Sequence, residues 1–409
     1  MKLAVIGGGA SGMLAAYAAA QNGADVTLFE ANEKLGKKLY ITGKGRCNIT
    51  NACDTEDFFN NIPTNKKFLY SALYTFTNDM LISLLNENGL VTKVERGGRV
   101  FPKSDKSSDV IRTLAEMLKK AGVKVKLNTK VKSLIFKDGA VNGVNTQNGK
   151  FFCDKTIVCT GGISYPLTGS TGDGYAFAKN AGHEIIKPEG SLVALTVNEQ
   201  NLIKPAQGLS LKNVKMTLKN GKKELYSEMG EMLFTHFGVS GPLVLSASAH
   251  LPSGFNDAKI IIDLKPALSE EKLDKRIVRD FSQEQNKRLK NALFMLMPKS
   301  LAGVITEYSG LDPEKFVHDI TKEERQRLIL AIKSFTLTVK EKRSVKEAII
   351  TRGGVCVKEI DPATMKSRLT DNLYFAGEVI DVDGYTGGFN LQIAFSTGYL
   401  AGLSAATGE

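Results

Sequence analysis

The chain has few of the residues that hold structural metals or cross-link secreted proteins. Its 409 residues include only four histidines and five cysteines. No two cysteines form a Cys-x-x-Cys pair and the histidines are scattered, so we expect no metal site. An odd cysteine count without an export signal favours reduced thiols and a cytoplasmic location. The cysteines are Cys47, Cys53, Cys153, Cys159 and Cys356, and the histidines are His183, His236, His250 and His318.

Long apolar runs are missing too. No stretch approaches the roughly 18 consecutive apolar residues that cross a membrane, so we expect no membrane partner. The composition, 42% apolar and 24% charged, is typical of soluble globular proteins, and the length predicts two or three domains. A formal net charge of +11 favours an anionic partner, which is either nucleic acid or the nucleotide cofactors themselves.

The first thirty residues have a strand, helix, strand pattern. The apolar run of residues 3–6 predicts a parallel strand buried on both faces. Residues 11–21, rich in alanine, predict a helix that lies close to the sheet, and residues 25–30 predict a second strand. This is the opening of a dinucleotide-binding domain.

The loop between this strand and helix fits the pattern G-x-G-x-x-G. Gly7 permits a tight turn, Gly9 lets the backbone approach a pyrophosphate, and Gly12 allows the helix to pack on the strand. With Ala10 and Ser11 at the helix N-terminus, these residues are expected to bind the cofactor phosphates.

Glu30 ends the second strand, eighteen residues after Gly12. A carboxylate at this position accepts hydrogen bonds from both ribose hydroxyls and repels a 2′-phosphate. The site therefore suits FAD or NAD, and the choice between them depends on residues elsewhere in the chain.

A second glycine-rich region favours FAD. A buried strand at 373–376 leads into Gly377 and Glu378, and Gly388 precedes a small-residue helix that begins near Asn390 and Leu391. A carboxylate after a strand can hold the ribityl hydroxyls, and a helix N-terminus can face the flavin N1/C2=O edge. An NAD enzyme needs no such second half-site. A generic glycine-rich loop is the alternative.

Three further segments are weaker candidates for cofactor contacts. Thr160 and Gly161 follow an apolar strand and are expected near the adenosine and phosphates, while Val131 begins a strand that can present backbone to adenine. Residues 34–51 contain five basic residues, no acid and several glycines, and we interpret them as a phosphate-facing loop rather than a solvated one. Its candidate contacts are Lys37, Lys38, Gly45 and Arg46.

The composition changes twice along the chain. We predict an α/β fold with a split Rossmann-like FAD-binding domain, formed by residues 1–190 and 335–409. Residues 191–267 carry short alternating strands that predict an inserted β-barrel or sandwich. Residues 268–334 predict a small helical domain, whose first helix is capped by Ser269.

Six stretches of the sequence resemble the three-domain bacterial flavoproteins of the BaiN/RdsA type, also called aminoacetone-oxidase-like FAD enzymes. They span nearly the whole chain. The resemblance implies the split fold above and FAD contacts at Ser11, Glu30, Lys37, Lys38, Arg46, Val131, Glu378, Asn390 and Leu391. The stretches are GGGASGMLAA (7–16), GKKLYITGKGRCNITN (36–51), TGGISYPLTGSTGDGY (160–175), MLFTHFGVSGP (232–242), TRGGVCVKEIDPATMKS (351–367) and LYFAGEVIDVDGYTGGFNLQIAFSTG (373–398).

The activities that the resemblance implies differ in substrate but share FAD. They are C=C reduction in steroid-type bile acid intermediates, reduction of an rRNA uridine to dihydrouridine, and amine oxidation. Our first hypothesis is an FAD-dependent reductase of a C=C bond in rRNA or a small enone. NAD(P)H is its transient reductant, because only one dinucleotide fingerprint is present. If the substrate is RNA, the basic loop and the basic helices near 275–290 can hold phosphates. The alternative is that these lysines lie on ordinary solvent-exposed faces and bind no partner.

Two other hypotheses remain open, an amine oxidase that uses O2 and a non-catalytic RNA-binding flavoprotein. For the reductase the candidate proton donors are Cys47, Tyr165, His236 and Tyr385. Cys47 lies in the basic loop, where a thiolate is favoured, although a small buried filler is equally consistent with the sequence. For His236, between Phe234 and Phe237, a packed core histidine is the favoured interpretation.

Overall fold

The computed structural model describes residues 1–408. The chain divides into two compact units. The two ends of the chain build the first, Met1–Ser191 with Val345 onward, and Leu192–Ser344 forms the second. No helix within residues 1–408 is long and apolar enough to span a membrane. The same residues contain no group of three or more His, Cys, Asp or Glu side chains arranged to hold a metal ion.

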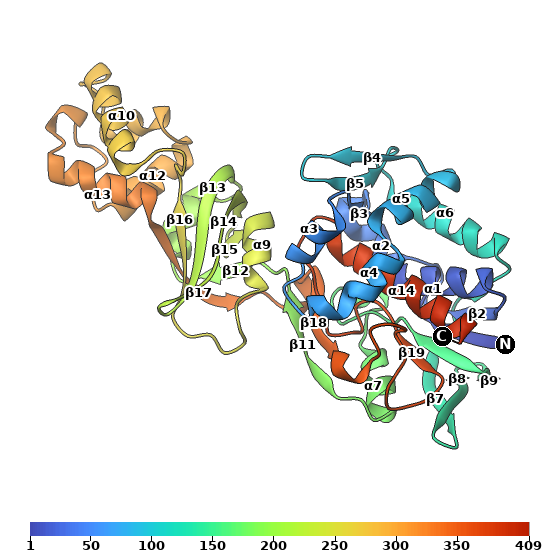
Figure 1. Ribbon diagram of the computed structural model, residues 1–409. Coiled ribbons are helices and arrows are strands. Elements are labelled where there is room, and N and C mark those ends of the chain that lie inside the picture. The colour runs from blue at the N-terminus through green and yellow to red at the C-terminus, as the bar shows by residue number, and fades with distance from the viewer. Residues whose placement is uncertain (409) are drawn as a thin grey trace. The chain divides into compact units, whose positions relative to one another are not determined.

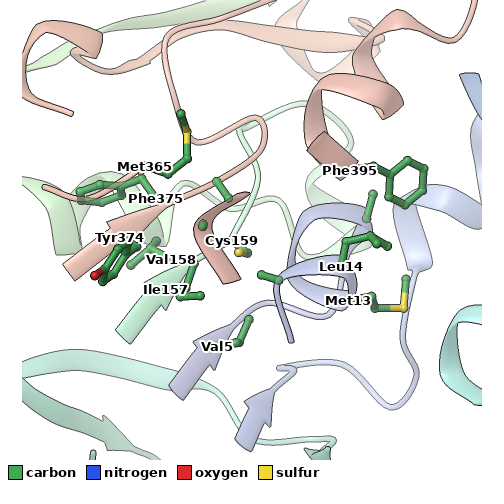
Figure 2. Packing of buried hydrophobic residues seen from close by; sticks show 14 of the residues in the cluster. Val5, Met13, Leu14, Ile157, Val158, Cys159, Met365, Tyr374, Phe375 and Phe395 are labelled. Carbon is green, nitrogen blue, oxygen red and sulfur yellow. The ribbon is translucent and has the colours of Figure 1, made fainter. Parts of the chain in front are cut away.

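A five-stranded parallel sheet forms the centre of the first unit, in the order β19-β10-β1-β2-β6. Val5 of β1 lies opposite Ile157 of β10 on one side and Leu28 of β2 on the other. Side chains from these strands and from flanking helices pack into one apolar core (Figure 2). This confirms the buried strands predicted at residues 3–6 and 373–376, whereas β6 at the edge of the sheet is mostly exposed. The bounds of the five strands are β1 Lys2–Ile6, β2 Asp25–Phe29, β6 Lys124–Lys126, β10 Lys155–Val158 and β19 Leu373–Phe375.

Helices α1 (Ala10–Gln21) and α14 (Phe389–Thr407) lie against each other although they come from opposite ends of the chain (Figure 1). Their backbones approach closely at two glycines of α14. A Cβ atom at Gly398 would lie 2.2 Å from the carbonyl oxygen of Ser11, and one at Gly402 2.1 Å from that of Ala15. Residues without side chains at these points therefore allow the two halves of the unit to join.

Smaller sheets and helices surround this centre. Their sheets have the orders β3-β5-β4, β7-β8-β9 and β11-β18. The strands are β3 Thr50–Asn51, β4 Thr92–Glu95, β5 Arg99–Pro102, β7 Val131–Lys137, β8 Ala140–Thr146, β9 Gly149–Phe152, β11 Ile185–Ser191 and β18 Ile350–Val355. The helices are α2 Lys37–Ile41, α3 Thr55–Asn60, α4 Tyr70–Thr75, α5 Asn78–Glu87, α6 Ser107–Lys120 and α7 Asp173–Asn180.

The second unit contains a closed barrel, β12-β15-β14-β13-β16-β17, and a group of helices (Figure 1). On β13 the side chains of Val214, Met216 and Leu218 are buried in alternation with more exposed neighbours, as expected for a strand with one face inside a barrel. The strands are β12 Leu195–Val197, β13 Ser210–Asn220, β14 Lys223–Phe234, β15 Gly238–Ser240, β16 Ala258–Asp263 and β17 Phe335–Lys342.

Helix α10 begins where the sequence predicts, because the Ser269 hydroxyl accepts a hydrogen bond from the Lys272 N–H. The last barrel strand differs from the expected boundary. β17 pairs with β12 and β16, so the unit continues to Ser344 rather than ending at residue 334. The helices are α8 Gln200–Ile203, α9 Pro242–Ser248, α10 Glu270–Gln283, α11 Leu289–Ala292, α12 Lys299–Tyr308 and α13 Lys322–Lys333.

Candidate functional site

The glycine loop between β1 and α1 is closed on one side and open on the other. Gly7 has a φ of 106°, and a Cβ there would lie 2.4 Å from the carbonyl oxygen of Cys159. A Cβ at Gly12 would lie 1.8 Å from the carbonyl oxygen of Gly7, whereas one at Gly9 would meet no atom within 4 Å. Gly7 and Gly12 therefore serve packing, and Gly9 leaves space beside the first N–H groups of α1.

Glu30 lies beside this loop rather than at a distance from it. Its carboxylate is buried, and Oε2 accepts a 2.8 Å hydrogen bond from the Gly8 N–H. Oε1 accepts bonds from the backbone N–H and the side-chain amide of Asn32, at 2.8 and 2.7 Å. Asn32 was missed in the sequence, although an amide two residues after an acid is a common signal for such a local bond.

Val131 lies at the start of β7, and backbone hydrogen bonds hold this end of the strand beside Glu30. Two residues before it, the Thr129 N–H donates to the Glu30 carbonyl at 2.8 Å, and the Asn128 N–H donates to the Asn32 carbonyl at 2.9 Å. The structure therefore brings Val131 and Glu30, which are a hundred residues apart in the sequence, into one corner of the first unit.

Lys38 and Glu378 form a partly buried ion pair that the sequence did not predict as a pair. Lys38 Nζ lies 2.5 Å from Glu378 Oε2, with side-chain exposures of 22% and 19%. Ser164 Oγ accepts from Lys38 at 2.7 Å and donates to Glu378 Oε1 at 2.9 Å. The Thr351 N–H also donates to Oε1, at 2.7 Å. Ser164 and Thr351 are new members of the site, which we call the Lys38–Glu378 cluster.

The end of β10 has an unused polar group. Within residues 1–408 the buried Thr160 hydroxyl makes no hydrogen bond. A Cβ at Gly174 would lie only 2.0 Å from its oxygen, so the space beside the hydroxyl exists because residue 174 is a glycine. Gly161 follows with a φ of 72°, a backbone conformation that favours glycine.

The loop before α14 is held together by Asn390. Its side-chain oxygen accepts from the Gly384 N–H at 2.8 Å, and its amide donates to the Gly384 carbonyl at 2.7 Å. The Asn390 amide is thus engaged within the loop, while the first backbone N–H groups of α14, including that of the half-buried Leu391, have no partners within the helix. Gly388 precedes the helix with a φ of 104°.

The two half-sites meet at Ser11 and Gly377. A Cβ at Gly377 would lie 2.5 Å from the Ser11 hydroxyl oxygen. The strand end that leads to Glu378 therefore lies directly against the first turn of α1. Only the folded chain joins the N-terminal and C-terminal glycine regions in this way.

The basic loop differs from its expected form because acids from outside the loop pair with it. Arg46 lies 2.5 Å from both Glu95 and Asp105 and stacks over the Phe101 ring at 4.1 Å. Lys37 pairs with Glu33 at 2.9 Å. Gly45 has a φ of 84° with open space around it. Contacts of Lys37, Gly45 and Arg46 with a cofactor stay predictions.

Cys47 does not have the reactive thiolate that its basic neighbours suggested. The side chain is completely buried, and this burial raises the pKa of the thiol to about 12. Among the cations of the loop, Lys37, Lys38 and Arg46 are paired with carboxylates, so they do not offset the loss of hydration. Cys47 is instead the small buried filler that the sequence left as the alternative.

His236 is not a packed core histidine. It is exposed in the short turn between β14 and β15 of the second unit, with its ring centroid 4.9 Å from that of Phe237. Phe234 is fully buried, but the strand ends there and the inward alternation does not continue to His236. The expectation failed because a turn, not a strand, carries the histidine.

Tyr165 and Tyr385 both lie in loops of the first unit and are half-buried. Tyr165 has a left-handed backbone, with a φ of 53°, directly after Ser164 of the Lys38–Glu378 cluster. The Tyr385 carbonyl accepts a 3.2 Å bond from Asn390. Their roles as proton donors stay predictions.

Asp381 is a candidate acid that the sequence reasoning missed. Burial raises the pKa of its carboxyl, and the negative charge of Asp383 adds to this effect. The amide of Asn65 donates to Asp381 Oδ2 at 3.0 Å. The signal in the sequence was the pattern Asp-x-Asp-Gly at residues 381–384, which begins three residues after Glu378.

Comparison with known proteins identifies the family of this chain. The model of the HI0933-like protein Rossmann domain matches residues 1–404. The chain belongs to this family. It is 32% identical to the 3-dehydro-bile acid delta(4,6)-reductase of Clostridium scindens, over 99% of each chain. It is 33% identical to the ribosomal RNA dihydrouridine synthase of Haemophilus influenzae, over 98% of this chain and 97% of the relative.

Among solved structures, the 3-ketosteroid delta1-dehydrogenase of Sterolibacterium denitrificans is similar in fold, with a TM-score of 0.52 at 14% identity, covering 100% of this chain and 99% of that one. This likeness concerns the fold alone. The full-length match to the family and to its named enzymes makes the chain a flavin-dependent oxidoreductase, as the sequence predicted.

Proposed function

We propose that this protein is an FAD-dependent reductase that uses NAD(P)H to saturate a C=C bond conjugated to a carbonyl group, with an rRNA uridine as the first candidate substrate. A small steroid-like enone is the second. The observation that supports the proposal most directly is the junction of the two half-sites at Ser11 and Gly377, in a chain whose full-length relatives are named for reductions of this kind.

The residues present fit FAD. The open space at Gly9 and the first N–H groups of α1 suit a pyrophosphate, and the unpaired Thr160 hydroxyl supplies a hydrogen bond for a polar group of the ligand. We infer that Glu30 binds the adenosine ribose by exchanging its bonds to Gly8 and Asn32 for bonds to the hydroxyls. The α14 N-terminus would face the flavin pyrimidine edge.

When bound, FAD supplies a ring that carries a hydride from NAD(P)H to an electron-poor carbon. The chain has to orient this ring and deliver a proton to the neighbouring carbon of the substrate. The Lys38–Glu378 cluster connects the basic loop, the loop after β10 and the strand end at Gly377, so it fixes the walls of the site. Among the proton donors, Asp381 suits the task best because its raised pKa keeps it protonated to higher pH.

The test has two parts. Anaerobic flavin bleaching by NADPH or NADH, followed by reoxidation with an added uridine-containing rRNA fragment or enone, supports the reductase. Fast bleaching by an amine without NAD(P)H would favour the oxidase instead. Mass spectrometry of rRNA nucleosides from a strain with and without the gene then decides the substrate, because unchanged dihydrouridine removes the RNA proposal.

A further inference from the structure

Two exposed tyrosines of the first unit stack on each other. Tyr70 and Tyr74 of α4 are 42% and 55% exposed, and their rings are 6.4 Å apart with planes at 21°. Phe59, a buried residue of α3, contacts both, with ring centroids 4.4 Å from Tyr70 and 5.9 Å from Tyr74. A spacing of four places the tyrosines on one helix face, and the buried ring holds them there. We call this surface the tyrosine platform.

Free positive charge lies next to the platform. Lys66 and Lys67 are exposed in the 3-10 turn that runs directly into α4, and neither forms an ion pair with any residue of the described chain 1–408. The nearest preceding acids in the sequence, Glu56 and Asp57, lie in the first turn of α3. Exposed stacked aromatic rings with unpaired lysines beside them match a ligand that has planar bases and phosphates.

The platform is fixed to the candidate site. Asn65, directly before the lysines, donates to the carbonyl and the carboxylate of Asp381 at 2.7 and 3.0 Å. The Tyr385 N–H donates to the Asn61 carbonyl at 2.9 Å. On the other side of α3, Phe58 packs edge-on against Phe389, the first residue of α14, at 4.8 Å. Hydrogen bonds and ring contacts thus connect the segment that carries the tyrosines to the loop that carries Asp381.

We propose that the tyrosine platform binds single-stranded RNA by stacking the bases that flank the reacting uridine, with Lys66 and Lys67 at the phosphates. The inference rests on the proposed function in its RNA form. A base that reacts has to leave its stack, and its neighbours then lose stacking partners of their own. Exposed aromatic rings replace those partners without reading the sequence. A small enone has no use for such a surface.

The experiment compares variants of the full-length FAD-loaded protein. The probe is a fluorescein-labelled single-stranded oligoribonucleotide of about 12 nucleotides, long enough to cover a typical site, followed by fluorescence anisotropy at fixed salt. The Tyr70→Ala/Tyr74→Ala variant is expected to bind about tenfold or more weakly, and Tyr70→Phe/Tyr74→Phe to bind like the parent. The Lys66→Glu/Lys67→Glu variant keeps the rings and is also expected to bind more weakly, with a smaller dependence of affinity on salt.

Phe152→Ala is the matched control, because Phe152 is an aromatic residue of the same unit with 57% exposure and no part in the platform. Its RNA affinity should equal that of the parent. Flavin bleaching by NAD(P)H and reduction of 2-cyclohexenone should stay unchanged in every variant, which shows that the site is intact.

The outcomes separate the two proposals. Equal RNA binding by the parent and the Tyr→Ala variant overturns the platform and leaves the proposed function standing. Weaker binding by Phe152→Ala to the same degree also overturns it, since the effect is then not specific to the platform. If the parent binds no RNA and reduces only small enones, this result overturns rRNA as the substrate. It also overturns the tyrosine platform as an RNA-binding surface, and it leaves the reductase with a small enone as its substrate.

Discussion

The candidate site of the first unit and the helices of the second unit both gather opposite charges, but they hold them differently. Lys38 and Glu378 are about four-fifths buried and share hydrogen bonds with Ser164 and Thr351. On α10 the pair Lys275–Glu271 spans one helical turn with both side chains three-quarters exposed or more. Exposed pairs of this kind contribute about 0–1 kcal/mol, whereas a buried carboxylate left without its partner destabilises the protein far more.

The pairing of cations with acids also indicates where an anionic partner is expected to bind. The basic helices near 275–290 had been a candidate phosphate surface, yet Arg276 and Arg279 both bind Asp280, and Arg288 and Lys290 bind Glu314. Each of these cations has an acidic neighbour, and each of the two acids is shared by two cations. The unpaired Lys66 and Lys67 of the first unit, which drew no attention in the sequence, are better placed for phosphate. Total charge therefore says little about the location of a binding surface.

The largest effect on stability is expected at Gly12 of the first unit, where the backbone leaves no space for a side chain. Gly12→Val places atoms against the Gly7 carbonyl, 1.8 Å from the position of a Cβ, and should lower the free energy of unfolding by about 3 kcal/mol or more. Gly9→Ala enters open space, so it should change that free energy by less than about 1 kcal/mol while lowering FAD content. Urea unfolding and flavin absorbance separate the two, and equal destabilisation would contradict this account of the loop.

The next effect concerns the buried pair. Lys38→Met leaves Glu378 without its cation, and because both groups keep about a fifth of their exposure we expect a loss of about 1–3 kcal/mol in stability, together with weaker FAD retention. Lys38→Met/Glu378→Gln should recover part of the stability, because no uncompensated charge remains. A double-mutant cycle by urea unfolding measures the coupling, and a value near zero would show that burial does not distinguish this pair from surface pairs.

A third prediction concerns pH. His183 is buried, with Nε2 2.7 Å from Ser367 Oγ and Nδ1 3.2 Å from Glu359. Burial lowers the pKa of the His183 imidazole, although Glu359 opposes the shift. The unfolded chain therefore binds a proton more readily, so stability should be full above a pH of about 6.5 and fall as the pH drops below it. In His183→Gln the urea midpoint should change less between pH 7.5 and 5.5; an identical change in both proteins would rule out His183 as the cause.

The smallest effect is expected on α10. Lys275→Met removes an exposed pair with Glu271 and should change stability by less than about 0.5 kcal/mol. RNA affinity should also stay within twofold of the parent, because this lysine is already paired. A large loss of RNA binding would show that the second unit, and not the tyrosine platform, supplies the phosphate contacts.

The sequence by itself determined the elements that depend on local pattern. The buried strand β1, the glycine turn and the small-residue helix α1 follow from apolar runs and from glycines whose positions leave no space for a side chain. Ser269 likewise marks the start of α10. The full-length similarity to known flavoenzymes also follows from the sequence, since its motifs recur nearly from end to end.

Only the tertiary structure decided which of these parts meet. The contact of Ser11 with Gly377, the pairing of Lys38 with Glu378 and the binding of Arg46 by Glu95 and Asp105 all join segments that lie far apart in the sequence. Burial also belongs to the whole fold, which is why the reactivity expected of Cys47 was wrong. Charge, pKa and exposure depend on what packs around a residue, and a local pattern does not contain that information.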